Sequence, residues 1–362
     1  MKFYVQQDVF RSVLMSVYRA VPSKSTLPVL SNFLFEAKDG NVQVSATNLE
    51  LSISLTMPAK VDEAGSICIP AKLLLDLVNN LPPKMIYIEV SDVSAIVTCE
   101  KSKSTLTTMP ASDYPDVPTI TDAPSHQIGN IVRLMSKVAS AAAYDDSRPV
   151  LTAVNMQLGD DAMIVAADGF RLAKNSLPAW NGEPINLLIP ATTINEATRV
   201  FADDDEISMQ IAENQNSITL FTKTKCMVSR LIDGKFPDVG RVIPTNHESL
   251  FSFEIADFQK AVKIASLMNP GGAVRLDIGN ESTMLVYSGS QQGTGSSRID
   301  GMHSGIHHDV AVNAKFLQDA LSTLASISTH AILHSSNANA PILFRPQGND
   351  TFLYIIMPIA VR

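Results

Sequence analysis

Apolar and polar residues alternate along much of this chain, and the alternation predicts many short β-strands. In the stretch NVQVSATNLELSISL, for example, apolar residues hold every second position from Leu49 to Leu55. Three other segments place apolar residues at helical spacing, which predicts amphipathic helices at 9–21, 128–140 and 258–268. Their apolar stripes are Val9, Phe10, Val13, Leu14 and Val17; Ile128, Val132, Met135 and Val138; and Phe258, Val262 and Ala265.

The same order of predicted elements occurs three times, so the chain is an internal repeat. Val29 and Val150 stand at matching places 121 positions apart, and Ile69 and Ile189 are 120 positions apart. In a fainter third copy, Val312 follows Ile189 by 123 positions. A second helix follows in each copy, and we expect these helices to begin at Ala71, Thr192 and Lys315.

An aromatic-Pro-Asp-Val turn occurs twice, as SDYPDVP at 112–118 and GKFPDVG at 234–240. Its two prolines, Pro115 and Pro237, lie 122 positions apart, each just after a strand-like stretch. Three domains need two linkers, so we interpret the turn as the linker. The predicted fold is α+β: three tandem two-layer domains at 1–120, 121–245 and 246–362, each with two helices packed on antiparallel sheet.

Composition is that of a soluble globular protein. Of 362 residues 45% are hydrophobic, and no apolar run approaches the roughly 20 residues that a membrane span needs. The three cysteines are too few and too scattered for a disulfide framework or a zinc site, which indicates a reducing cytoplasm. The net charge of −8 argues against whole-surface attraction to nucleic acid but leaves room for a local basic face.

The three predicted first helices carry charge of one sign. None of the segments 9–21, 128–140 and 258–268 contains an Asp or a Glu. We interpret them as basic faces for a polyanion, since backbone phosphates need only Lys and Arg and carry no sequence information. Solvated faces that lack acids by chance are the alternative. The residues concerned are Arg11, Arg19, Arg133, Lys137, Lys260 and Lys263.

No catalytic constellation emerges from the sequence. The acidic run 203–206 and the Tyr144–Asp146 stretch lack supporting groups, and the histidines of GIHH at 305–308 lack further ligands at metal-binding spacing. The Gly/Ser-rich stretch from Ser288 has no phosphate-binding Lys. We therefore expect no enzyme activity, metal or cofactor. A hydrolase or nuclease that uses a metal at 203–206 is one alternative.

Four stretches together resemble one family over the whole chain: LPVL at 27–30, ADGFRLA at 167–173, LIDGKFPDVGRVIP at 231–244 and the C-terminal Met357–Pro358. They resemble the bacterial DNA sliding clamps, the β subunits of DNA polymerase III. The resemblance implies a ring of two copies, with helices around a hole that encircles duplex DNA. Such a ring is a processivity factor that tethers the replicative polymerase.

The resemblance also implies a pocket between the second and third domains, where polymerases, the clamp loader and repair proteins dock a short peptide. Ala167 and Phe170 stand where the family commonly has Thr and His, and the usual ending is replaced by MPIAVR, so the pocket is expected to be more apolar. The matching positions are Leu151, Gly169, Phe170, Arg171, Leu172, Pro237, Arg241, Val242, Ile355, Met357, Pro358 and Ile359.

For DNA the resemblance points to Lys24 and Arg148, beside which Pro149 and Val150 replace the aromatic residues often found there. Ring closure is expected where the first domain of one copy meets the third domain of the other, at Leu106, Leu267 and Met268. A repeat scaffold that binds peptides without riding DNA is the second alternative.

Overall fold

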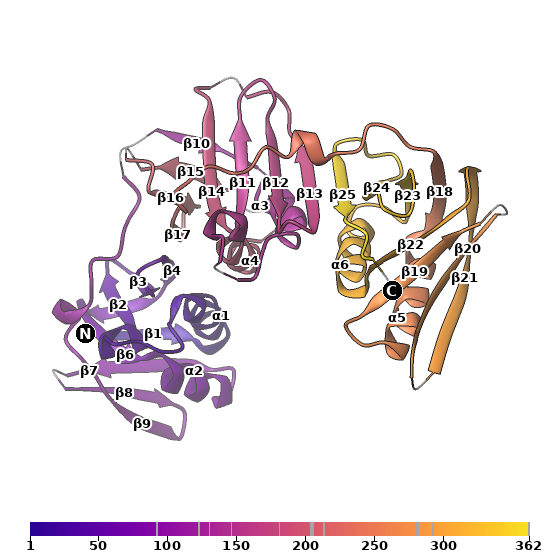
Figure 1. Cartoon of the computed structure of the whole chain (residues 1–362). Coiled ribbons are helices and arrows are strands. Elements are labelled where there is room, and N and C mark those ends of the chain that lie inside the picture. The colour runs from indigo at the N-terminus through magenta and orange to yellow at the C-terminus, as the bar shows by residue number, and fades with distance from the viewer. Residues whose placement is uncertain are drawn as a thin grey trace. The chain divides into compact units, whose positions relative to one another are not determined.

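The computed structural model of this chain describes residues 1–91, 93–121, 124–129, 131–145, 147–180, 182–202, 206–212, 214–279, 282–291 and 293–360. The chain divides into two compact units, one of residues 1–132 with 195–231 and the other of 133–194 with 232–362 (Figure 1). None of the helices within the described residues combines the length and apolar character that crossing a bilayer requires.

The first unit contains a five-stranded antiparallel sheet whose order is β5-β1-β7-β8-β9. Helix α1 (Gln7–Val17) buries one face, including Phe10 and Leu14, and helix α2 (Ala71–Asn80) lies next to it. Phe10 packs edge-on against Phe3 and Phe35. The strands are β1 (Lys2–Gln6), β5 (Lys60–Glu63), β7 (Met85–Val90), β8 (Ser94–Cys99) and β9 (Ser102–Thr107).

The second sheet of this unit has eight strands in the order β10-β15-β16-β17-β4-β3-β2-β6. Its centre is the antiparallel pairing of β4 with β17, which we call the first joint because it links the first repeat to the second. The strands are β2 (Asn32–Lys38), β3 (Asn41–Thr47), β4 (Leu51–Pro58), β6 (Gly65–Pro70), β10 (Ser125–Gln127), β15 (Ser208–Ile211), β16 (Ser217–Phe221) and β17 (Lys225–Arg230).

The second unit contains a twelve-stranded sheet whose order is β14-β11-β12-β13-β25-β24-β23-β18-β21-β20-β19-β22. Antiparallel pairing of β13 with β25 links the second repeat to the third, and we call it the second joint. The strands are β11 (Ala153–Leu158), β12 (Met163–Ala167), β13 (Arg171–Ser176), β14 (Ile185–Pro190), β18 (Ser249–Glu254), β19 (Ala273–Ile278), β20 (Thr283–Ser290), β21 (Gly293–Gly305), β22 (His308–Asn313), β23 (His330–Ser335), β24 (Ile342–Pro346) and β25 (Phe352–Ile356).

The remaining helices are α3 (Ile131–Ala139), α4 (Ala191–Val200), α5 (Ile255–Met268) and α6 (Ala314–Ala325). Helices α2, α4 and α6 begin at Ala71, Ala191 and Ala314, within one residue of the predicted starts. For α6 the reason is a cap: Asn313 Oδ1 accepts hydrogen bonds from the amides of Lys315 and Phe316. Short 3₁₀ turns are η1 (Tyr18–Ala20), η2 (Pro28–Ser31), η3 (Ala111–Asp113), η4 (Pro149–Thr152) and η5 (Gly240–Val242).

The predicted α+β class is confirmed, because helices pack on sheets whose strands, within the described residues, all pair antiparallel. The prediction of acid-free first helices is wrong for two of the three. Helix α1 includes Asp8 and helix α5 includes Asp257, each in its first turn. Acidic side chains are favourable there because the helix N-terminus carries partial positive charge, so both helices begin earlier than the apolar stripe predicts.

Candidate functional site

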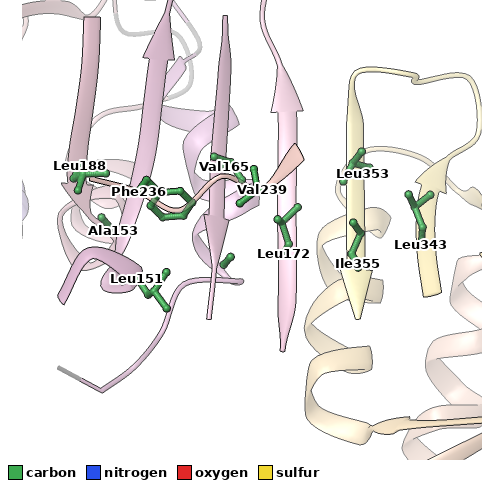
Figure 2. Packing of buried hydrophobic residues seen from close by; sticks show 11 residues of the cluster. Leu151, Ala153, Val165, Leu172, Leu188, Phe236, Val239, Leu343, Leu353 and Ile355 are labelled. Atoms are coloured by element: carbon green, nitrogen blue, oxygen red, sulfur yellow. The ribbon is translucent and has the colours of Figure 1, made fainter. Parts of the chain in front are cut away.

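A cluster of buried apolar side chains lies at the second joint (Figure 2). Strands of the second repeat supply one part, strands β24 and β25 supply another, and the segment that follows β17 supplies Phe236 and Val239. Ile232, Ile243 and Val150 pack against it and stay partly exposed. The cluster is Leu151, Ala153, Val165, Ala167, Leu172, Leu188, Phe236, Val239, Leu343, Leu353 and Ile355.

Register explains why residues far apart in the sequence meet here. Leu172 of β13 lies directly opposite Ile355 of β25, and both side chains are buried on the same face. Successive residues of a strand point to opposite faces, so a shift of one residue would remove both from the cluster. The joint therefore fixes the cluster and the strand pairing together.

The segment 232–243, which we call the connector, crosses this face of the sheet in Figure 2. At the start of the connector, the amide of Ile232 donates a hydrogen bond to Leu188 O at 2.9 Å. Gly234 has φ +133°, and a Cβ there would lie 2.7 Å from Val150 Cγ1, so this close approach requires glycine. At the other end Val242 is 44% exposed, and Arg241 pairs with Asp238 across 3.4 Å.

Arg171 lies beneath the surface of the joint, with no exposed side-chain area. Its guanidinium contacts Asp168 at 2.9 Å and Asp319 at 2.6 Å, and lies 4.4 Å from the ring centre of Phe316. Burial acts to lower the pKa of Arg171, but Tyr354 and the two carboxylates raise it above its ordinary value. The sequence prediction placed Arg171 among residues that touch a peptide; in the structure its guanidinium pairs with Asp168 and Asp319 of the same chain.

Phe170 is the exposed neighbour of Arg171, with 59% of its surface accessible. Its ring stacks on Phe316 with centres 6.5 Å apart, and its carbonyl accepts the amide of Met357 at 2.8 Å. Gly169 has φ +94°, and a Cβ there would lie 3.2 Å from Arg148 Nη2. An aromatic side chain is thus presented at the edge of the cluster, on a turn that needs glycine.

The structure brings most of the predicted peptide residues to the second joint, in different roles. Leu151, Leu172 and Ile355 belong to the buried cluster, and Ala167 lies among them. Pro237, Arg241, Val242 and Ile359 are exposed, and Met357 and Pro358 are half-buried. Sequence reasoning missed Phe236, Val239, Phe316, Asp168 and Asp319. Phe236 and Val239 stood in the quoted turn, so its apolar pair was the available signal.

Three family models match the chain in succession, and each describes a part of one protein. They are the N-terminal domain of the DNA polymerase III beta subunit at residues 1–118, the central domain at 127–238 and the C-terminal domain at 240–360. The chain belongs to the DNA polymerase III beta-subunit family. The threefold repeat is therefore the domain pattern of that family.

Relatives of this family member match it from end to end. The beta sliding clamp of Streptomyces coelicolor is 27% identical over 373 residues, covering 99% of each chain. Among solved structures, a sliding clamp from Pseudomonas aeruginosa bound to griselimycin is 26% identical with a TM-score of 0.91, covering 100% of both chains. The Bacillus subtilis clamp, at 24% identity and TM-score 0.91, shows the same fold over 100% of both chains.

The basic residues predicted for DNA lie on helices or in exposed loops of this beta-subunit fold. Lys24, Arg148, Arg11, Arg133 and Lys263 are exposed. Arg19 lies in the 3₁₀ turn η1 and pairs with Glu196 at 3.0 Å, while Lys260 pairs with Asp257 at 3.0 Å. Burial and the neighbouring charge of Arg133 lower the pKa of Lys137.

The predicted dimer residues differ in exposure. Leu106 is buried within its own domain on β9, whereas Leu267 is 68% exposed at the end of α5. Met268 lies over β21, where a Cβ on Gly295 would come within 2.8 Å of Met268 Cγ. Within the described residues β9 pairs only with β8, and residues 293–300 of β21 pair only with β20, so both strands present an open edge.

The enzyme alternatives concern acidic stretches that the structure describes only in part. No group of three His, Cys, Asp or Glu side chains there is arranged to hold a metal ion. Residues 203–205 and Asp146, from the two acidic stretches, lie outside the described ranges. Cys68 and Cys99 are buried free thiols, and burial raises the pKa of Cys68 to about 12, which keeps it unreactive.

Proposed function

We propose that this protein is a DNA sliding clamp, a processivity factor of DNA polymerase III. The observation that carries the proposal is the succession of three beta-subunit domains, together with relatives that match along the full length. We propose domains at 1–120, 121–245 and 246–362. In this function the protein catalyses no reaction; it holds duplex DNA by topology and tethers the replicative polymerase.

Two copies would close the ring through the open edges. Edge β9 of one copy and residues 293–300 of β21 in the other each carry a row of unpaired backbone groups, which antiparallel pairing would satisfy. The exposed Leu267 next to β21 supplies apolar area for the same contact. Burying an exposed apolar side chain of this size stabilises association by roughly 2 kcal/mol.

Partners would dock on the cluster surface at the second joint. Phe170, Val242 and Ile359 are exposed apolar side chains around the buried cluster, and aliphatic or aromatic anchors suit such a surface. The griselimycin complex of the Pseudomonas aeruginosa clamp supports ligand binding in the family. We include polymerase, clamp loader and repair proteins among the partners, in the cytoplasm.

Contacts with DNA would come from the basic helices and loops. Lys and Arg side chains at adaptable positions bind phosphates without reading sequence, and weak contacts of this kind let a ring slide. The net charge of −8 fits weak adhesion outside the ring, where repulsion from the DNA backbone limits unspecific binding.

The test is retention on nicked circular and on linear duplex DNA, by gel filtration after incubation with a clamp loader and ATP. Retention on the circle and loss from the linear form is the expected result, and equal retention on both would overturn encirclement. An Arg133→Glu/Lys137→Glu variant should be retained less, whereas the charge-matched Lys38→Glu/Lys223→Glu variant should behave as wild type. Normal retention of the Arg133→Glu/Lys137→Glu variant would show that α3 does not contribute to DNA binding.

A scaffold that binds peptides without riding DNA is the second candidate. Pro149 and Val150 stand beside Arg148 in place of aromatic residues, which favours weaker DNA contacts at that loop. The same experiment separates the two functions. A scaffold would bind the peptides described below while being retained on neither DNA form with its cognate loader.

A further inference from the structure

A cavity of about 300 Å³, lined by both apolar and polar side chains, lies beside the connector, on the sheet of the second repeat. Strands β11, β12, β13 and β14 form its floor, and the connector from Lys235 to Ile243 forms its wall. Among its lining residues, Phe236, Val239 and Val165 also belong to the apolar cluster in Figure 2. The cavity therefore adjoins the docking surface. Its polar lining comprises Asn155, Gln157, Lys174, Asn186, Lys235 and Asp238.

The charge in this cavity is positive. Asp238 is the acid that lines it, and its carboxylate is already engaged by the amide of Gly240 at 3.0 Å and by Arg241 at 3.4 Å. No ion pair of the described residues involves Lys174 or Lys235. Lys174 stands between Val165 and Leu353 in the register of the sheet, so its stem crosses apolar side chains and its ammonium group is left for a ligand.

Asn155 supplies an unused hydrogen-bond acceptor. It is 5% exposed, and its Oδ1 accepts no hydrogen bond from the residues that the structure describes. Buried side-chain oxygens of this kind usually have a partner. Turning the amide by 180° would exchange its oxygen and nitrogen, so either atom can meet a ligand.

Two cations and an unsatisfied acceptor suit a ligand that has both an anionic group and an N–H donor. A free anion such as acetate supplies no donor, whereas a peptide supplies an acidic side chain and its own backbone amides. We propose that the cavity takes an Asp or Glu residue of the same partner peptide whose apolar anchors dock on the cluster surface. This inference rests on the proposed function and adds an acidic residue to the peptide's recognition.

The width of the connector, a single strand of backbone, sets the number of peptide residues needed between the apolar anchor and the acidic residue. Neighbouring strands lie about 4.8 Å apart, and an extended peptide advances about 3.3 Å per residue. Roughly two to four residues are therefore enough to pass over the connector from the apolar anchor to the cavity. An acidic residue much closer to the anchor, or much farther from it, should gain nothing.

The probes are fluorescein-labelled synthetic peptides with a Leu-Phe anchor and two Glu or two Gln residues, separated by Ser-Gly linkers of one, three or eight residues. The acidic pair is placed before the anchor in one set and after it in the other. Fluorescence anisotropy with the full-length protein gives the Kd of each peptide. The variants are Lys174→Gln/Lys235→Gln and, as a control for lost positive charge, Lys38→Gln/Lys223→Gln.

We expect the acidic peptide with a three-residue linker to bind wild type about tenfold more tightly than its Gln counterpart, in one of the two orders. The preference should vanish in Lys174→Gln/Lys235→Gln and persist in the control variant. An Asn155→Leu variant, which removes the unused acceptor, should fold normally and lose part of the preference.

Equal binding of Glu and Gln peptides to wild type would overturn the cavity's assigned ligand and leave the docking surface intact. A preference that is the same for every linker length, or that is lost in the control variant, would reduce the effect to general attraction and likewise overturn the assignment. Failure of every peptide to bind would instead contradict peptide docking in the proposed function, and with it this inference.

Discussion

The two joints of this chain share one backbone arrangement and differ in the side chains that it carries. At the first, Asn48 Oδ1 accepts the amides of Glu50 and Leu51, and Glu50 O accepts the amide of Arg230. At the second, Asp168 Oδ1 accepts the amides of Phe170 and Arg171, and Phe170 O accepts the amide of Met357. The same type of turn thus joins the equivalent strand pairs, β4 with β17 and β13 with β25.

The side chains carried by that turn give the joints different chemistry. Leu51, buried and apolar, corresponds to Arg171 with its two carboxylates, and Glu50 corresponds to the exposed Phe170. In the two aromatic-Pro-Asp-Val turns, the hydroxyl of Tyr114 accepts a hydrogen bond from the amide of Thr47 at 3.1 Å, whereas Phe236 has no hydroxyl. The first joint is closed by internal hydrogen bonds, whereas the second leaves the apolar side chain of Phe170 exposed.

The largest effect is expected from Arg171→Met. Removing the cation leaves Asp168 and Asp319 without their buried partner, which should destabilise the second joint by about 3 kcal/mol. Hydrogen exchange of β13 and β25 amides measures this locally, with β4 and β17 amides of the first joint as the internal reference. Adding Asp168→Asn and Asp319→Asn should restore much of the lost stability. The Asn at position 168 can still accept the turn's amide hydrogen bonds, as Asn48 does at the first joint. Unchanged protection of β13 would mean that the ion pairs contribute nothing.

The second prediction concerns the pH dependence of stability that Tyr114 confers on the first aromatic-Pro-Asp-Val turn. Burial raises the pKa of Tyr114 to about 12. The folded state then holds this proton more tightly than the unfolded state, whose pKa is about 10, so the stabilisation is complete below pH 10 and is lost as the pH rises through 12. Wild type should therefore lose about 2 kcal/mol more than Tyr114→Phe over this interval, measured by urea unfolding. Parallel losses in both proteins would assign the alkaline transition to other groups.

The third comparison concerns binding at matched positions of the two turns. Phe170→Ala should weaken binding of the Leu-Phe peptides about tenfold, because an exposed aromatic side chain beside a buried cluster is a typical anchor contact. Glu50→Ala, at the corresponding place in the first joint, should leave the affinity unchanged. Both residues are exposed, so thermal stability should hardly move in either variant. Equal affinities of the two variants would place the docking surface elsewhere.

The smallest effect tests the turn itself. Leu49 and Gly169 hold the same place, with φ +75° and φ +94°, a region that glycine adopts more easily than leucine. Leu49→Gly should therefore raise thermal stability slightly, by about 0.5 kcal/mol, and Gly169→Ala should lower it by about 1 kcal/mol. Differential scanning calorimetry of both variants checks the opposite signs. A loss in Leu49→Gly would show that its exposed side chain makes a stabilising contact.

The repeat and the starts of the second helices could be predicted from sequence. The repeat shows as matching residues such as Val29 and Val150, 121 positions apart, and the helix starts rest on local spacing. The buried position of Arg171 could not be predicted, since its partner Asp319 lies 148 positions away. The first-helix boundaries failed for a local reason: Asp8 and Asp257 precede the apolar stripe, so a reading of the stripe alone omits them. Phe236 belongs to the buried cluster, and Phe316 packs against Arg171 and Phe170; both sets of contacts join residues that are far apart in the sequence.

Because β13 pairs with β25, the second joint has a consequence for synthesis of the chain. Residues 171–176 leave the ribosome long before residues 352–356, so the edge of β13 and the apolar face beside Leu172 stay uncovered throughout translation of the third repeat. Open edges and apolar faces are where nascent chains pair with each other. A truncated product that ends before β25 should therefore be a target for chaperones and proteases rather than a partly working protein.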